Sequence, residues 1–398
     1  MLKNSIISEL TIDKASPEPY HLQLYNSLKQ YIIRHRLNAG TALPSERQLS
    51  ITFELNRNTV HRAYQSLKDE GILATKPQSR GLFISENAKE IYQPSFPCIG
   101  IVLTCSFSDF LSKGSKMGVK YLSGIVDRAN ELNFSTMIIN LPHLSCSKQE
   151  IDKWREELIY RLSGIIYFGD RAVKGDYAFE SLITYKQIPQ IFASGYSLHK
   201  NVSTVSADVR TGGMAAAELL QENGHRKVGI IIPPLGVDRD WGFINMSHKR
   251  PQTMKECFES CGLKVAPEWI IDECCDLEVI TQKMDKIFSS GEAPTAFWCQ
   301  NDFTAIYALE YFKSRNIKIP EDISLIGFDD IEEGANSIPP LTSIRTGTYT
   351  IGKKSVELLA ELFHNAAIGE SRQILVPTSL SCRQSVSEAK STLTEVQI

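Results

Sequence analysis

The stretch ALPSERQLSITFELNRNTVHRAYQSLKDEGIL (residues 42–73) decides the fold of the N-terminal part of the chain. Ser45 can begin a short helix, because its hydroxyl can cap the helix while Gln48 reaches back to it. A second helix is expected after Leu55, with Asn56 as its N-cap. Spacing of 3.6 residues gives this second helix one apolar side. The side chains on that side are Val60, Ala63, Tyr64 and Leu67.

The opposite side of the second helix is polar and basic. It carries Arg57, Asn58, Thr59, His61, Arg62 and Gln65. In a helix-turn-helix, the first turn of the second helix enters the major groove of DNA. Arginine can bind guanine there with two hydrogen bonds, and asparagine can bind adenine in the same way. A solvated charged face is the alternative for any single residue, but the ordered set favours DNA recognition.

The flanking segments complete a winged helix. The segment 19–36 has apolar side chains at helical spacing and predicts a preceding helix. After the stretch, GILATKP and GLFIS alternate like two short strands joined by QSR, which predicts a β-wing. Arg80, at that turn, is placed to reach a phosphate or the minor groove.

Residues 19–85 resemble the winged-helix head of the GntR family of transcription factors. The resemblance rests on LPSERQL, NRNTVHRAYQSLKDEGIL and KPQSRGLFIS. It implies that Arg47, Arg57 and His61 occupy base-contacting positions, and many members carry Arg where this chain has His61. The candidate DNA-contacting residues are Ser45, Arg47, Arg57, Asn58, Thr59, His61, Arg62, Arg80 and Gly81.

Charge separates this head from the rest of the chain. The 398 residues have a net charge of −3, but residues 1–85 carry 11 basic and 7 acidic side chains. A basic head on an acidic body fits a polyanion-binding module. No signal peptide or membrane-length apolar run is visible, and the nine cysteines are scattered, so we expect reduced thiols in a cytoplasmic protein without membrane partners.

The remainder alternates apolar runs with helical segments. Such alternation predicts parallel sheets covered by helices on both faces. The expected strands are 98–105, 135–140, 163–169, 188–194, 227–232, 293–299 and 323–329. Because ligands of open α/β sheets bind at the carboxyl ends of the strands, the residues after each strand are the candidates for a binding site.

Those positions hold carboxylates, amides, hydroxyls and aromatic rings, a mixture that suits a polyhydroxylated ligand. They include Phe107 and Phe110 in SFSDF, Asp170, Asn301 with Asp302, and Asp329. Helix capping is an equally good interpretation for Asn301 and Asp302, and the two roles can coexist.

The body resembles the LacI/GalR regulators, which carry a periplasmic-binding-protein-like sensor. The matching text lies at 205–231, 294–332 and 338–359. The resemblance implies two Rossmann-like lobes joined by three crossovers, with an effector in the cleft. It carries over Arg250, Asn301 and Asp329 as effector contacts, with Asp302 beside them. The glycine that usually follows the Arg by three residues is missing at Arg250.

The expected fold is therefore an α/β sensor of the periplasmic-binding-protein type with an N-terminal winged helix-turn-helix. We expect a DNA-binding domain at 1–85, a linker at 86–97, a two-lobed domain at 98–386 and a tail at 387–398. The combination resembles arabinose-repressor-type chimeras and indicates a homodimeric repressor, which a monosaccharide, by association a pentose or deoxy-hexose, releases from operator DNA. An activator or a corepressor-dependent regulator would use the same parts.

The sequence gives little support for an enzyme. The sequence has no G-x-S-x-G elbow, and no His stands near Cys257 and Cys261 or the pair at 274–275 at zinc-ligand spacing. GTYTIGKK (347–354) nearly matches a phosphate-binding loop but has Lys354 at the hydroxyl position. A GntR head fused to a pyridoxal-phosphate domain is the remote enzyme-like alternative. We expect no cofactor, no metal and no catalysis.

Overall fold

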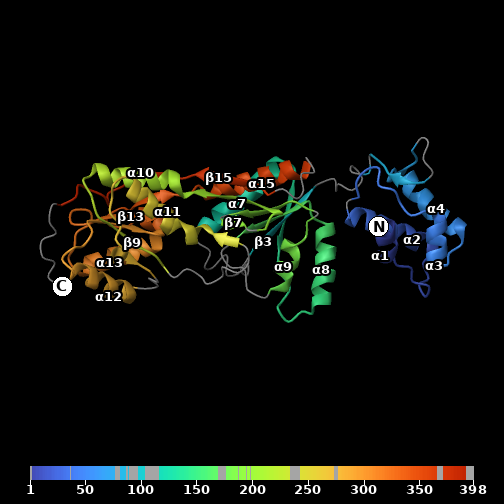
Figure 1. The fold of residues 1–398 in the computed structure, drawn as a ribbon, viewed down its shortest axis with the longest axis horizontal. Coiled ribbons are helices and arrows are strands. Elements are labelled where there is room, and N and C mark those ends of the chain that lie inside the picture. The colour runs from blue at the N-terminus through green and yellow to red at the C-terminus, as the bar shows by residue number, and fades with distance from the viewer. Residues whose placement is uncertain are drawn as a thin grey trace. The chain divides into compact units, whose positions relative to one another are not determined.

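The computed structural model describes most of the chain. The described residues are 2–35, 37–76, 81–86, 88, 97–103, 116–168, 176–186, 188–193, 195–197, 199–233, 243–272, 277–364 and 371–390. They fall into two compact units, and many of their elements are labelled in Figure 1. The first unit comprises Met1–Ile99, Asn133–Ser135 and Pro142–Ser163, and the second comprises the rest.

The head, within the first unit, is a helical cluster with a small wing. Its elements are α1 (Leu2–Glu9), α2 (Tyr20–Arg34), α3 (Glu46–Phe53), α4 (Arg57–Asp69), β1 (Leu73–Ala74) and β2 (Phe83–Ile84). The strands pair antiparallel, Leu73 opposite Ile84, as the wing requires. The expected helix at 19–36 is confirmed as α2. Helix α1 was not predicted, yet Ile6 is fully buried in the same core.

Both predicted caps are present in the head. The hydroxyl of Ser45 accepts from the backbone N–H of Gln48, and the Gln48 side chain accepts from the backbone N–H of Ser45. Asn56 caps α4 by accepting from the N–H of Asn58. The predicted apolar side of α4 is buried in full: Val60, Ala63, Tyr64 and Leu67.

The described part of the second unit contains two six-stranded sheets. The sheet of the first lobe has the order β15-β8-β6-β5-β3-β4. Its strands are β3 (Cys98–Leu103), β4 (Ser135–Ile139), β5 (Gly164–Phe168), β6 (Gln190–Ala193), β8 (Val202–Asp208) and β15 (Gln373–Pro377). The helices α7 (Lys116–Glu131), α9 (Tyr177–Ile183) and α15 (Thr348–His364) belong to the second unit, whereas α8 (Lys148–Tyr160) belongs to the first.

The sheet of the second lobe has the order β11-β9-β12-β13-β14-β16 and is parallel except at β16. Its strands are β9 (Val228–Ile231), β11 (Ile270–Ile271), β12 (Ala296–Cys299), β13 (Ser324–Phe328), β14 (Thr342–Arg345) and β16 (Ser379–Ser381). Its helices are α10 (Val209–Glu222), α11 (Met246–Ser260), η1 (Pro267–Trp269), α12 (Leu277–Phe288), α13 (Asp302–Ser314) and α14 (Glu332–Ala335). A short antiparallel pair joins β7 (Gly195–Ser197) to β10 (Phe243–Asn245).

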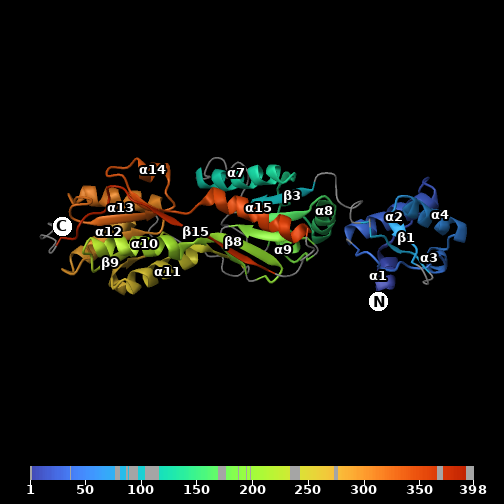
Figure 2. The same cartoon turned by 90° about the horizontal axis from the view of Figure 1, so that it is seen from above.

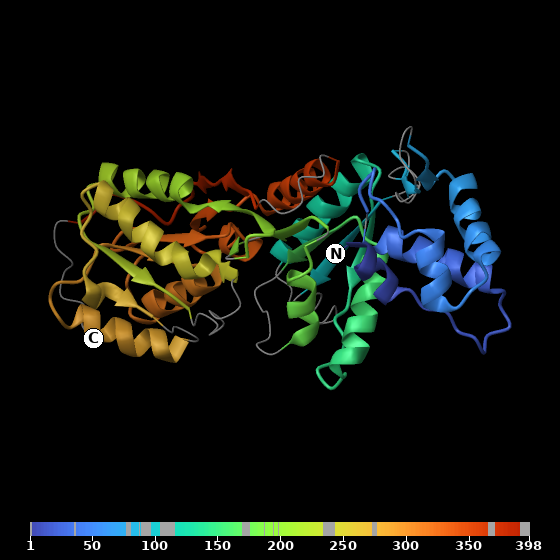
Figure 3. The ribbon, with the colours of Figure 1, turned by 45° about the vertical axis from the view of Figure 1, so that its right-hand side comes forward.

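Alternate residues of β12 bury on opposite faces of the second sheet. Phe297 packs with α12 and α13, whereas Trp298 packs with α10 and α11. Helices α10 and α11 lie together over their face of the sheet (Figures 2 and 3). This pattern explains why the strand has no polar alternation, and it confirms the predicted α/β fold with both faces covered.

Among the described residues, the chain crosses between the two lobes three times, between β8 and α10, between β14 and α15, and between β15 and β16. The crossings are tied together at Thr378, whose hydroxyl donates to the carbonyl of Asp208 at 2.7 Å and accepts from the N–H of Gly212 at 2.8 Å. A Cβ on Gly212 would lie 2.6 Å from Ile344. Close packing at this junction therefore requires glycine.

The stretch that resembled a phosphate-binding loop is used for structure. Gly347 has φ +62° at the second crossing, where glycine is favoured. Gly352 lies against α7, because a Cβ there would be 2.4 Å from the carbonyl oxygen of Tyr121. The glycine allows α15 and α7 to lie side by side (Figure 2).

The end of the described chain is bonded to the second lobe. His225 is 1% exposed, and its Nε2 lies 3.1 Å from the carbonyl oxygen of Ser387. Burial lowers the pKa of His225. The N–H of Ala389 donates to the carbonyl of Asn223 at 2.8 Å. Ser387 and Ala389 lie in the stretch that was expected to form a tail. No helix within the described ranges has the length and apolar character needed to cross a bilayer.

Candidate functional site

The outer face of α4 and the start of α3 form the first candidate site. Arg47, Arg57, Asn58, His61 and Arg62 are exposed, and Thr59 is half-buried. Ser45 is exposed as well, but its hydroxyl is already engaged in the cap of α3. Gly81 is exposed beside the wing, with φ +142°. Arg80 lies outside the described residues. The fold thus leaves the basic side chains of both helices exposed to solvent.

Glu46 connects the two helices of this surface. One carboxylate oxygen lies 2.8 Å from Nδ1 of His61, and the other lies 3.4 Å from Nε of Arg57. The side chains of His61 and Arg57 are 60% and 73% exposed, and that of Glu46 is 26% exposed. Glu46 was not predicted as part of this surface, because the sequence does not show which basic residue of α4 an acidic residue at the start of α3 will face.

The orientation of α4 is fixed from its buried side. The hydroxyl of Tyr64 donates to the carbonyl of Pro44 at 2.6 Å, and burial raises the pKa of Tyr64. The turn between α3 and α4 has Glu54 in the left-handed region at φ 54°. These contacts hold α4 in one orientation against α3, which recognition by a rigid helix requires.

The second candidate site lies at the carboxyl ends of β12 and β13. Arg250, from α11, donates from Nη1 to the carbonyl of Gln300 at 2.7 Å and lies 3.4 Å from the carboxylate of Asp329. Its guanidinium carbon lies 3.8 Å from the centre of the Phe328 ring, within the range of a cation–π contact. The structure therefore brings two of the predicted residues, Arg250 and Asp329, within 3.4 Å of each other, and it places Arg250 against the backbone of Gln300, the residue before Asn301.

Asn301 has the capping role that the sequence left open. Its side-chain oxygen accepts from the N–H of Thr304 at 2.8 Å and from the Thr304 hydroxyl at 2.9 Å, which caps α13. The cap uses only the amide oxygen. Capping therefore does not exclude a ligand contact through the amide nitrogen.

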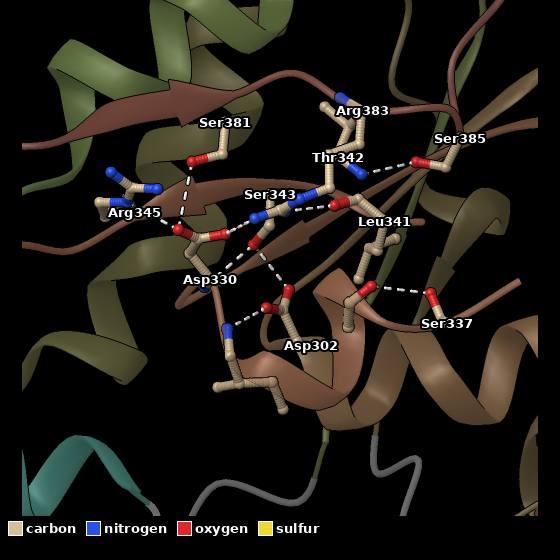
Figure 4. A network of polar contacts seen from close by, with 12 residues as sticks. Asp302, Asp330, Ser337, Leu341, Thr342, Ser343, Arg345, Ser381, Arg383 and Ser385 are labelled. Atoms are coloured by element: carbon tan, nitrogen blue, oxygen red, sulfur yellow. Dashed lines mark hydrogen bonds and ion pairs between the residues drawn. The ribbon is translucent and has the colours of Figure 1, made fainter. Parts of the chain in front are cut away.

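Asp302 lies beneath this surface. It is 1% exposed, one of its oxygens accepts from the hydroxyl of Ser343 at 2.7 Å, and the other accepts from the N–H of Ile331 at 2.8 Å (Figure 4). A Cβ on Gly327 would lie 2.0 Å from the first oxygen. Burial raises the pKa of Asp302 to about 7, although the two hydrogen bonds act in the opposite direction. With both oxygens engaged inside the lobe, Asp302 supports the loop after β13.

That loop makes a sharp turn. Asp329 and Asp330 have φ 103° and 55°, a conformation that costs roughly 1–3 kcal/mol for each residue that is not glycine. Three successive N–H groups hold it in place. Asp329 donates to the carbonyl of Ile344, Asp330 donates to the hydroxyl of Ser343, and Ile331 donates to Asp302. The turn presents Asp329 to Arg250.

Asp330 points to the other side of the turn, into a cluster of cations (Figure 4). Its two oxygens each lie 2.6 Å from a guanidinium nitrogen, one from Arg383 and one from Arg345. Burial acts to raise its pKa, but the two guanidinium groups hold the pKa below the usual range. The different roles of these adjacent aspartates could not be predicted from sequence, because they depend on the left-handed turn at both residues.

Three residues proposed from sequence, Phe107, Phe110 and Asp170, lie outside the described residues. Within the described ranges, no three His, Cys, Asp or Glu side chains are grouped so as to hold a metal ion. The two candidate sites therefore offer hydrogen bonding and charge, on an exposed surface in the head and at the strand ends of the second lobe.

Comparisons with known proteins match the same two parts. Residues 21–84 match the model of bacterial regulatory proteins of the gntR family, and residues 217–386 match the periplasmic binding protein-like domain. An arabinose metabolism transcriptional repressor of Geobacillus stearothermophilus is 26% identical over 382 residues, covering 93% of this chain and 98% of that protein.

Another relative matches a shorter part of the chain. The transcriptional repressor CytR of Escherichia coli K12 is 29% identical over 187 residues, 47% of this chain and 53% of that protein. The chain thus spans about half the length of CytR.

Solved structures agree on the fold. A putative LacI regulator from Bacillus cereus subsp. cytotoxis covers 74% of this chain and 100% of its own, with a TM-score of 0.58 and 18% identity. A regulator titled CelR in complex with cellobiose covers 86% of this chain and 99% of its own, with a TM-score of 0.56 and 17% identity.

Proposed function

Because the chain joins a GntR-type winged-helix head to a periplasmic-binding-protein-like body, we propose that it is a transcriptional repressor of this composite type. The head binds operator DNA, and a small molecule bound by the body releases it. The proposed division is a DNA-binding domain at 1–85, a linker at 86–97, the two-lobed domain at 98–386 and a tail at 387–398. The named relatives are transcription regulators rather than enzymes, which supports a function without catalysis.

The observation that carries this proposal is the exposed face of α4. A capped helix buries one side and presents Arg57, Asn58, His61 and Arg62 on the other. This is the arrangement that the recognition helix of a helix-turn-helix needs. Arg47 adds a cation from α3. Phosphate contacts by such cations supply much of the affinity, so binding should fall steeply with salt.

The proposed effector site is at Arg250, Asn301 and Asp329, with Phe107, Phe110 and Asp170 as further proposed contacts from the first lobe. Asp302 is proposed as the residue that holds the loop carrying Asp329. Arg250 and Asp329 are 11% and 12% exposed, so a ligand would meet partly desolvated charges. Such groups bind hydroxyls strongly and reject analogues that lack them.

We place a monosaccharide in this site. The support for a sugar is the mixture of carboxylate, amide and guanidinium groups, together with the names of two similar proteins, an arabinose metabolism repressor and a regulator in complex with the disaccharide cellobiose; arabinose, a monosaccharide, is named by the relative that covers nearly the whole chain. Binding that favours one arrangement of the lobes would change the operator affinity of the heads. The coupling is reciprocal, so DNA should weaken effector binding by the same factor. An activator or a corepressor-dependent regulator would show the opposite sign.

We also propose that the working form is a homodimer. Helix α13 exposes Phe303 and Tyr307, one turn apart, to 50% and 39%. Ile338, in the loop after α14, is 95% exposed. Exposed large apolar side chains on neighbouring elements favour contact with another protein surface. A second copy would bring a second head to an operator of two half-sites.

The test is a titration of operator DNA with the full chain, with and without a panel of monosaccharides. Operator fragments come from selection out of a random library. The proposal expects specific binding that one or more sugars weaken. Specific binding that every sugar leaves unchanged would contradict the effector assignment, and the absence of any enriched sequence would contradict the repressor assignment.

A further inference from the structure

The contact between Glu46 and His61 determines whether the recognition helix presents a hydrogen-bond donor or an acceptor to DNA at His61. The Glu46 carboxylate lies 2.8 Å from Nδ1 of His61, so one ring nitrogen is used inside the protein. In the described part of the head, no hydrogen bond uses the other nitrogen, Nε2, and the side chain is 60% exposed. The free end of the imidazole therefore faces outward. This inference rests on the proposed function of α4 as the recognition helix.

The chemistry of the pair determines the tautomer. An ionised carboxylate has no proton to donate, so it can only accept a hydrogen bond. Nδ1 must then carry the proton and donate it to Glu46. A neutral imidazole has one N–H, which leaves Nε2 with a lone pair as an acceptor. A carboxylate fixes the tautomer of a metal-bound histidine in the same way, by accepting the N–H of the ring nitrogen that does not bind the metal.

A hydrogen-bond acceptor at His61 selects other bases than an arginine does, and many related heads carry an arginine at this position. In the major groove, adenine and cytosine present amino-group donors, whereas guanine presents two acceptors and thymine presents one. An arginine donates and prefers guanine. We infer that His61, held by Glu46, selects adenine or cytosine at the operator position it faces, and disfavours guanine and thymine.

Arg57, one helical turn from His61, has the opposite base preference, for guanine. Arg57 approaches Glu46 through Nε, at 3.4 Å, and no hydrogen bond within the described head uses its terminal nitrogens, which leaves them for a paired contact with guanine. The carboxylate of Glu46 thus leaves an acceptor on His61 and a pair of donors on Arg57, one helical turn apart. The operator should combine a guanine read by Arg57 with an amino-bearing base read by His61.

The experiment is a selection of the full chain on a randomised operator library at pH 8.5, where imidazoles are in general uncharged. The same selection is run on His61→Arg, Glu46→Gln and the control Asp69→Asn, which removes a carboxylate from the far end of α4. The position read by His61 is the one whose base preference changes in His61→Arg. The affinity of all four bases at that position is then measured by titration.

The inference expects adenine or cytosine in the parent, on the order of 10-fold tighter than guanine or thymine. His61→Arg should switch the preference to guanine. Glu46→Gln should reduce the discrimination, because an amide can accept from or donate to Nδ1 and no longer fixes the tautomer. Asp69→Asn should keep the parental preference. Melting curves of the variants check that each is folded, which the exposure of His61 leads us to expect.

Other results would overturn it. A parental preference for guanine or thymine, no change of preference in His61→Arg, or unchanged discrimination in Glu46→Gln would each refute the role of the pair while leaving DNA binding intact. The lack of any enriched sequence would instead refute the function of the head, and this inference with it. The two failures are therefore distinguishable.

Discussion

Replacing Asp302 with asparagine tests the polar network beneath the effector loop. The substitution keeps the shape of the side chain. The amide oxygen can accept from the N–H of Ile331, and the amide nitrogen can donate to the hydroxyl of Ser343, which are the two groups that contact Asp302. It removes the charge that burial disfavours. The consequence should appear as a change in how stability depends on pH.

The magnitude follows from the pKa. Burial raises the pKa of Asp302 from 3.8 to about 7. Between these values the folded protein keeps a proton that the unfolded chain releases, so the free energy of unfolding falls as pH rises. The slope is ~1.4 kcal/mol per pH unit. Between pH 5 and pH 8, the ionisation of Asp302 should lower the free energy of unfolding of the parent by about 2.5 kcal/mol, because the decrease stops near pH 7.

The assay is urea unfolding at pH 5 and pH 8, followed by the fluorescence of the four tryptophans, of which Trp269 and Trp298 are buried in the second lobe. Asp302→Asn should lose about 2.5 kcal/mol less than the parent between the two pH values. Glu321→Gln is the control, because this exposed carboxylate lies in the same lobe. If Asp302→Asn lost as much stability as the parent, the desolvation of Asp302 would be refuted.

The remaining predictions concern the two sites and the dimer. Arg57→Ala should lower affinity by ~1–3 kcal/mol for the operator base it reads and leave sugar affinity unchanged; equal affinity for all operators in a binding titration would reject its base contact. Asp329→Asn tolerates the positive φ but removes the charge, so calorimetry should show a loss of sugar affinity of at least tenfold, on the order of 1.4 kcal/mol, with operator binding retained. Phe303→Asp should shift the dimer towards monomer in analytical ultracentrifugation, and an unchanged dimer would place the interface elsewhere.

Much of the head could be predicted from sequence, because its signals are local. Caps and the 3.6-residue apolar pattern lie within single helices, and they identified α3 and α4 with their buried side. Helix α1 was missed because its eight residues carry too little pattern, and its stability comes from packing Ile6 into a core formed by later residues.

The body could be predicted at the level of strands, but its site only in part. Arg250 and Asp329 meet as the resemblance implied. The position of Asp302 beneath the loop could not be predicted. It depends on the left-handed turn at Asp329 and Asp330 and on the contact with Ser343, which involve residues far apart in sequence. The junction of Gly212 with Thr378 joins residues 166 positions apart, which no local pattern indicates.

The central claim is that a small molecule held by the two-lobed body controls how tightly the basic head binds DNA. The most direct measurement is the operator affinity of the full chain, at one ionic strength, across a series of sugar concentrations. The account predicts that an effective sugar weakens operator binding in the parent and that Asp329→Asn binds the operator equally well but does not respond. Operator affinity that stays constant in the parent at saturating concentrations of a sugar shown by calorimetry to bind the body would contradict it.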